Sequence, residues 1–172
     1  MSASRSAEPQ ATQRTDPHRG DHGLPHPAAV RGAWAAAVLF CLVATFHAAL
    51  VLGAPWGEAT QGGATAGTLP ASGRLVAALS CVLSIAMAGA ILARVGRGPL
   101  RRCAPRLRSV LAWTTLAYAA IAVVLNLITR SSTERALWAP VSVALLGLVS
   151  FVVVTSSPRR HPAASEQPPA PK

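Results

Sequence analysis

Residues 74–108 read RLVAALSCVLSIAMAGAILARVGRGPLRRCAPRLR, an apolar run that leads into a loop with six arginines and no acidic residue. A bilayer core of about 30 Å needs roughly 20 helical residues, because each residue adds about 1.5 Å. The run from Arg74 to Ala93 meets that length, and Arg74 lies at its end, where a long side chain can reach the headgroups. This stretch therefore predicts a membrane-spanning helix followed by a basic loop.

Three other segments share these properties, so the chain is predicted to cross the membrane at 34–54, 74–93, 109–129 and 137–155. None of these segments contains Asp, Glu or Lys. A helix satisfies its own backbone hydrogen bonds in lipid, which a short open sheet cannot do. We therefore predict an all-α polytopic membrane protein, an antiparallel bundle of four transmembrane helices. The first segment is expected to be retained, because its apolar core exceeds the roughly 7–15 residues of a signal peptide.

The two ends of the chain differ from this central part. Residues 1–32 are rich in Ser, Ala, Pro, Gln and charge, and residues 156–172 are rich in Pro and Ala. Such segments bury too little apolar surface to offset the entropy of ordering. The sequence thus predicts a transmembrane domain at 33–155 between two disordered cytoplasmic tails.

The histidines and cysteines do not predict a metal site or a cofactor. His18, His22 and His26 recur every four residues and would share one face of a helix, but Gly20 and Pro25 oppose that helix. The three cysteines, Cys41, Cys81 and Cys103, are expected at different depths, which disfavours a disulfide or metal pair. They are interpreted as isolated thiols.

The basic residues predict the orientation. Loop 94–108 contains six arginines, whereas loop 55–73 contains no basic residue. Arginine-rich short loops stay on the cytoplasmic side. We therefore expect a cell-membrane protein with both termini in the cytoplasm.

The net charge of +10 raises the question of nucleic-acid binding. Gly98, Pro99 and Pro105 interrupt any long recognition helix, and the loop has no aromatic side chain for base stacking. No nucleic-acid partner is predicted. Anionic lipid headgroups are the expected contacts, at about 1 kcal/mol per arginine, and the candidates are Arg97, Arg101, Arg102, Arg106 and Arg108.

Polar residues inside the predicted spans indicate packing contacts. Ser80, Ser84 and Ala88 form a small-residue stripe, which lets a neighbouring helix approach closely. His47 and Asn126 are expected at similar depths below the outer surface, so a hydrogen bond between their side chains is predicted. The alternative for these two residues is a ligand or proton-handling role.

The two predicted outer loops each combine an acid, a tryptophan and a proline. One interpretation is structural: Ser131, Ser132 or Thr133 caps the fourth span, Glu58 pairs with Arg130 or Arg135, and Glu134 pairs with Arg74. The other is a ligand-binding vestibule. Its candidate residues are His47, Trp56, Glu58, Arg74, Asn126, Glu134, Arg135 and Trp138.

Several motifs also resemble a family of small, uncharacterised four-span membrane proteins of actinobacteria. They are Gly53-Ala-Pro-Trp-Gly57, Leu69-Pro70 with Arg74, Leu125-Asn126-Leu127, Glu134-Arg135 and Trp138-Ala-Pro140. The resemblance covers residues 33–155. It implies the fold and a membrane location, and no activity.

Two functions follow as hypotheses. The first is a noncatalytic accessory or scaffold protein that binds another membrane protein or a second copy of itself. The alternative is an outward-facing carrier or receptor for a small cationic ligand or lipid. An enzyme is disfavoured, because the sequence contains no HExxH, GxSxG, CxxC or phosphate-binding glycine loop.

Overall fold

Four long helices form the protein, whose computed structural model describes residues 26–156. They are α1 (Pro27–Val51), α2 (Ala71–Arg94), α3 (Pro105–Ile128) and α4 (Ser132–Thr155), and three short 3-10 turns join them, η1 (Gly57–Ala59), η2 (Gln61–Gly63) and η3 (Pro99–Arg102). Each of the four helices is long and apolar enough to span a membrane. The predicted all-α class and the four spans are confirmed. Most of the two predicted tails lies outside the described residues.

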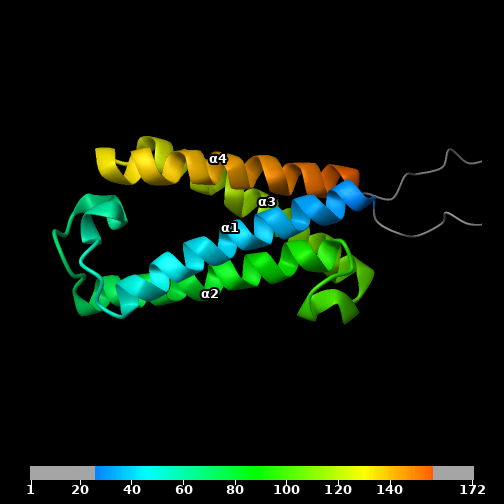
Figure 1. Ribbon diagram of the computed structural model, residues 1–172, viewed down its shortest axis with the longest axis horizontal. Helices are drawn as coiled ribbons and strands as arrows, with labels where there is room; N and C mark the ends of the chain where they lie inside the picture. Colours follow the sequence, from blue (N-terminus) through cyan, green and yellow to red (C-terminus); the bar gives the residue numbers. More distant parts are fainter. Residues whose placement is uncertain (1–25, 157–172) are drawn as a thin grey trace, which may run out of the picture.

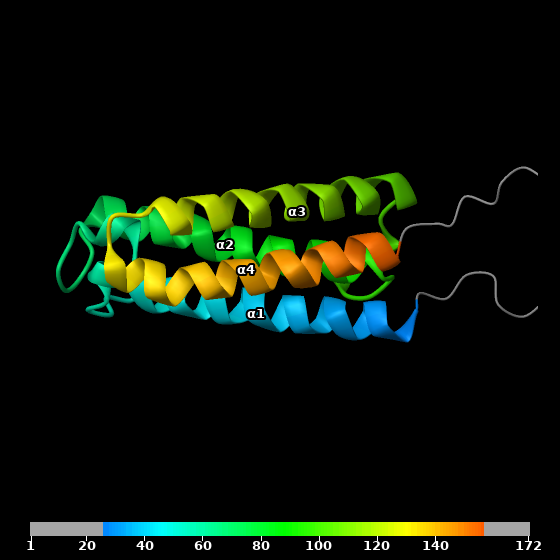
Figure 2. The same ribbon diagram turned by 90° about the horizontal axis from the view of Figure 1, so that it is seen from above.

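The helices form two antiparallel hairpins, α1–α2 and α3–α4 (Figure 1). The hairpins meet at the end that carries η3 and diverge toward the end that carries η1 and η2. Seen from above, α1 and α4 lie on one side of the bundle and α2 and α3 on the other (Figure 2). The α1–α2 loop, residues 52–70, folds back between the diverging ends of the hairpins (Figure 1).

The core at the η3 end is built from small residues of α1 against branched residues of α4. Ala33 and Ala36 are fully buried, and Val149 and Val152 pack in the same cluster. Gly32 makes this crossing close, since a Cβ at this position would lie 3.0 Å from the Phe151 ring. Small side chains allow such an approach of two helices in a membrane.

The small-residue stripe of α2 also faces the interior. Ser84 and Ala88 are 1% and 5% exposed, and Ser80 is half-buried. The Ser84 hydroxyl donates 2.8 Å to the Ser80 carbonyl, so the helix itself satisfies this buried polar group. The stripe therefore serves packing within the bundle, as predicted.

Two helix starts follow from their caps. α4 begins after Ser131, whose Oγ accepts a 3.2 Å hydrogen bond from the Glu134 N–H, which confirms one of the three predicted caps. α1 begins at Pro27, inside the segment assigned to the first tail. Proline is favoured in the first helical turn, and His26 Nδ1 accepts from the Ala28 N–H, so these residues extend the helix beyond its apolar part.

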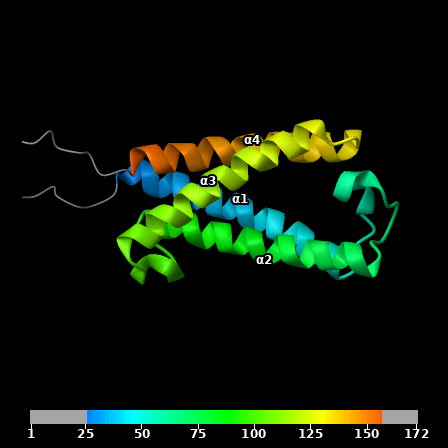
Figure 3. The ribbon, with the colours of Figure 1, turned by 180° about the vertical axis from the view of Figure 1, so that it is seen from behind.

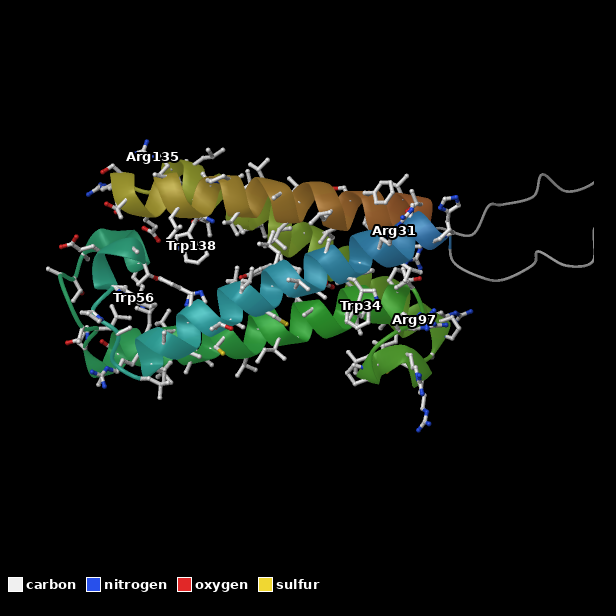
Figure 4. All side chains as sticks on the ribbon, in the orientation of Figure 1. Arg31, Trp34, Trp56, Arg97, Arg135 and Trp138 are labelled. Atoms are coloured by element: carbon white, nitrogen blue, oxygen red, sulfur yellow. The ribbon has the colours of Figure 1, made fainter. Side chains whose placement is uncertain are left out.

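Tryptophans and arginines mark both ends of the bundle. Trp34, Arg31 and Arg97 lie at the η3 end, whereas Trp56, Trp138 and Arg135 lie at the η1–η2 end (Figure 4). Tryptophan is enriched at membrane–water boundaries. These labelled side chains therefore gather at two opposite ends of the bundle.

Candidate ligand site

A cavity of about 410 Å³ lies between the two hairpins in the half of the bundle toward η1 and η2. All four helices and the α1–α2 loop contribute to its wall. The lining residues are Phe40, Val43, His47, Thr60, Gly62, Ser84, Tyr118, Ile121, Ala122, Leu125, Asn126, Thr129, Glu134, Trp138, Val141, Ser142 and Leu145. The cavity exists because the hairpins diverge. Their side chains are in contact at the η3 end, whereas the hairpins are apart in this half of the bundle.

The lining changes in character along the bundle axis. Phe40 and Leu145 are buried and close the end toward the bundle centre. Thr129 and Glu134 lie at the opposite end, where α3 passes into α4. Concave sites with an apolar wall and a few polar groups are typical of small-molecule binding. The arrangement is a mainly apolar site with a polar end, and the Ser84 and Ser142 hydroxyls along its wall bond carbonyls of their own helices.

Residues 57–63, named here the cap segment, cover the polar end. Trp138 Nε1 donates 2.7 Å to the Ala59 carbonyl, and the Ser131 hydroxyl donates 3.2 Å to the Glu58 carbonyl. The Gly62 N–H in turn donates 2.8 Å to Glu134 Oε2. Three hydrogen bonds therefore attach the cap segment to the first turns of α4.

Glycines give the cap segment its shape. Gly63 has φ +70°, a conformation that side chains disfavour, and a Cβ there would lie 2.7 Å from the Ser131 Cβ. Gly57 is buried, and a Cβ on it would lie 2.5 Å from the Thr65 carbonyl oxygen. Gln61 fixes the segment to α2 by donating 2.8 Å from Nε2 to the Gly73 carbonyl.

The Glu134 carboxylate holds three parts of the chain together. Its Oε2 accepts from the Gly62 N–H and also, at 2.7 Å, from the Thr129 hydroxyl. The predicted Glu134–Arg74 ion pair is wrong: Arg74 donates from Nε to the Leu69 carbonyl at 3.1 Å. Backbone and hydroxyl donors already occupy Oε2, so the acid needs no arginine for solvation.

The predicted hydrogen bond between His47 and Asn126 is not formed, although both residues line the cavity. His47 Nδ1 is buried without a hydrogen-bond partner in the described part of the chain. The His47 ring instead lies parallel to the Trp138 ring, with centroids 6.3 Å apart. Both side chains line the same cavity, but no hydrogen bond joins them.

The other vestibule candidates do not join this cavity. Trp56 and Glu58 line a second hollow of about 410 Å³ on the outside of the cap segment. Arg74 and Arg135 line neither hollow. The predicted pairing of Glu58 with Arg130 or Arg135 is also absent among the described residues. The structure thus brings four of the eight candidates together in the cavity, places two at the second hollow and leaves two outside both.

Five polar residues that line the cavity were not among the predicted ligand-site candidates: Thr60, Ser84, Tyr118, Thr129 and Ser142. Thr60 is buried in the cap segment, Ser84 and Ser142 are buried on α2 and α4, and Tyr118 is half-buried on α3. Tyr118 could have been found, because it is the one tyrosine of the chain and lies in the middle of a predicted span. Thr60 had no comparable signal.

The predicted lipid-contact arginines lie at the other end of the bundle, in and around η3. Arg97, Arg101, Arg102 and Arg106 are exposed, and Arg108 is half-buried. Arg94 is tied into the bundle, since it donates to the hydroxyls of Ser156 at 3.0 Å and Ser109 at 2.8 Å. The cationic end and the cavity are therefore separate features.

Comparisons of the chain with known protein families, curated proteins and solved structures gave no match. Within residues 26–156, no group of three or more His, Cys, Asp or Glu side chains could hold a metal ion. The cavity presents a carboxylate, an imidazole, an amide and hydroxyl groups at one end of an apolar wall. Such a set can hold the polar end of an otherwise apolar molecule.

Proposed function

We propose that the protein is a noncatalytic multi-pass membrane protein that binds a small ligand in the cavity between its hairpins. The observation that carries this proposal is the convergence of His47, Asn126, Glu134 and Trp138, from three helices, around one cavity. The cell membrane is its location, and both termini are cytoplasmic, in accordance with the arginine distribution. The η1–η2 end then faces outward.

The side chains favour a ligand with one cationic or hydrogen-bond-donating group. Glu134 uses Oε2 for the cap segment and Thr129, which leaves Oε1 for an ammonium or hydroxyl group of the ligand. The Trp138 ring lies beside it and can cover an adjacent methylene or ammonium group. The apolar remainder contacts Val141, Leu145 and Phe40.

This proposal takes precedence over the accessory or scaffold function. The small-residue stripe was one of the sequence features that favoured a partner protein, beside the small size of the chain and its lack of paired charges within the spans. Because Ser84 and Ala88 are buried between this chain's own helices, the stripe offers no surface to another protein. The resemblance to actinobacterial four-span proteins is compatible with either function.

Dodecylamine is a suitable probe, because it joins one ammonium group to an alkyl chain. Native mass spectrometry of the protein released from lipid nanodiscs would count bound amine. One molecule per chain is expected for the unmodified protein. Glu134→Gln should weaken binding about tenfold, which corresponds to the loss of roughly 1.4 kcal/mol from a charge-assisted hydrogen bond.

A matched pair of α4 variants separates the cavity from the lipid-facing surface. Ser142→Leu fills the cavity, because Ser142 is 3% exposed and lines it. Ala144→Leu adds the same volume on the exposed face. Binding should fall in the first and persist in the second. Equal dodecylamine binding by all these proteins would mean partition into lipid and would refute the proposal.

A further inference from the structure

The cavity is closed toward the end of the bundle but reaches the side of the bundle. The cap segment closes the end through its hydrogen bonds to Ser131, Glu134 and Trp138. Thr60, from the middle of this segment, is 7% exposed although it lines the cavity. A ligand from the water outside would have to break these contacts to enter.

The side between α1 and α4 is also closed. The Phe46 ring of α1 and the Trp138 ring of α4 meet edge to face, with centroids 4.7 Å apart. Below this contact, Val43 and Val141 are half-buried and line the cavity from both helices. Aromatic pairs of this geometry attract each other by about 0.5–1.5 kcal/mol beyond area burial.

The side of the cavity between α2 and α3, by contrast, is open. Ile121 and Leu125 line the cavity, yet each is 58% exposed on the bundle surface. They lie four residues apart and so share one face of α3. Ser84 is the one described residue of α2 that lines the cavity. Figure 3 shows α2 and α3 crossing near η3 and diverging along this half of the bundle.

We infer that the ligand is a single-chain amphipath dissolved in the bilayer, which enters sideways between α2 and α3, past Ile121 and Leu125. This inference rests on the proposed function and adds the ligand class and the route. Hydrocarbon faces the exposed side chains of α3 in a membrane, so an alkyl chain moves from one apolar surface to another without meeting water.

The geometry sets the orientation of this ligand. Its polar group lies at Glu134 and Thr129, where the end of the bundle meets the headgroup region. Its chain follows α4 toward Leu145, a distance of about 16 Å at about 1.5 Å per residue. Phe40, which is 1% exposed, ends the path. The amphipath thus keeps the orientation that it has in one leaflet.

The tryptophans provide a direct readout. A protein that retains Trp138 alone reports on the cavity, and one that retains Trp56 alone reports on the exterior of the same end, because Trp56 is 49% exposed. Both would be placed in nanodiscs. The probes are succinimide, a neutral quencher in water, and dodecylamine dibrominated on its chain, a quencher in lipid. Expected results are weak succinimide quenching of Trp138, stronger quenching of Trp56, and saturable quenching of Trp138 by the brominated amine.

Two α3 variants of the Trp138 protein then test the route. Leu125→Phe narrows the opening, whereas Val124→Phe adds bulk at a site that is 56% exposed and does not line the cavity. Leu125→Phe should slow quenching by the brominated amine roughly tenfold, as about 1.4 kcal/mol of added barrier would do. Val124→Phe should leave the rate unchanged.

The inference would be overturned if both variants were quenched at the wild-type rate while Ser131→Ala, which loosens the cap segment, accelerated quenching. Entry from water would then be the route, and the proposed function would survive, because the amine would still bind saturably. Absence of saturable quenching in the unmodified Trp138 protein would refute the proposed function as well. The two failures are therefore distinguishable.

Discussion

Oε2 of Glu134 accepts a 2.8 Å hydrogen bond from the backbone N–H of Gly62, which joins the first turn of α4 to a loop that lies 72 residues earlier in the chain. The same oxygen accepts from the Thr129 hydroxyl. One carboxylate therefore connects the two hairpins at the end where they are farthest apart. The cap segment is held to α4 by this acceptor together with the hydrogen bonds of Ser131 and Trp138.

Glu134→Ala should loosen the cap segment without unfolding the bundle. The substitution leaves the Gly62 N–H and the Thr129 hydroxyl without their acceptor, which costs about 1 kcal/mol at a half-exposed site. Amide hydrogen exchange of residues 57–63 should become about fivefold to tenfold faster. Glu58→Ala is the matched control, because the cap contact of Glu58 is made by its backbone carbonyl. Equal acceleration in both variants would contradict the assigned role.

Trp138→Phe should affect the same segment through a different bond. Phenylalanine keeps an aromatic ring beside Phe46 but removes the Nε1 donor that reaches the Ala59 carbonyl at 2.7 Å. The loss of one partly buried hydrogen bond should lower the stability of the closed cap by about 1 kcal/mol. Hydrogen exchange at Ala59 and Thr60 measures this change. Trp113→Phe, at an exposed site on α3, should leave exchange unaltered.

Two glycine substitutions should differ in their effect on the stability of the bundle. Gly32→Ala places a methyl group 3.2 Å from a Val152 methyl at the α1–α4 crossing, and Val152 is fully buried. Thermal unfolding in detergent should show a loss of about 1–3 kcal/mol from overpacking. Gly147→Ala, with no atom within 4 Å, should be neutral or gain up to about 1 kcal/mol from helix propensity. An equal effect at both sites would argue against a tight crossing.

Phe40→Ala should lengthen the cavity, because this ring closes the end toward the bundle centre. The variant should lose about 3–5 kcal/mol of stability. Among alkylamines of increasing chain length, the optimum for binding should move to longer chains than in the unmodified protein. Native mass spectrometry with competing amines measures the shift. Val38→Ala, on the exposed face of α1, should keep the original optimum.

Cysteine labelling tests the proposed orientation. Cys103 follows η3 and is half-buried, and Thr68 is exposed in the α1–α2 loop. In intact cells, a membrane-impermeant maleimide should label Thr68→Cys but leave Cys103 unmodified until the cells are broken. The opposite pattern would invert the topology and place the cavity toward the cytoplasm.

The helices could be predicted from sequence because each depends on local properties. Hydropathy over about 20 residues identifies a span, and a serine before Glu134 identifies the start of α4. The start of α1 was missed because residues 27–32 are helical without being strongly apolar. In that segment the histidine cap and the alanines determine the structure.

The site could be predicted only in part. Depth along a span follows from counting residues, and the two residues predicted at similar depths, His47 and Asn126, line the same cavity. Their separation by a cavity depends on the angle between two hairpins, which no short segment encodes. The partners of Glu134 were missed for a related reason: Gly62 offers only a backbone N–H, which every residue except proline has, whereas Arg74 carries an obvious charge.

The tight alanine contacts of α1 with α4 at the η3 end have a mechanical consequence. α1 is 25 residues long, which is about 37 Å, and it diverges from α4 beyond these contacts. A small change in the α1–α4 crossing angle near Ala33 therefore becomes a larger displacement at the far end of α1. A change of about 5° in the crossing angle near Ala33 would move the far end of the helix, about 27 Å away, by about 2 Å. The width of the cavity therefore depends on a crossing angle set at the opposite end of the bundle, by alanine methyl groups that do not line the cavity.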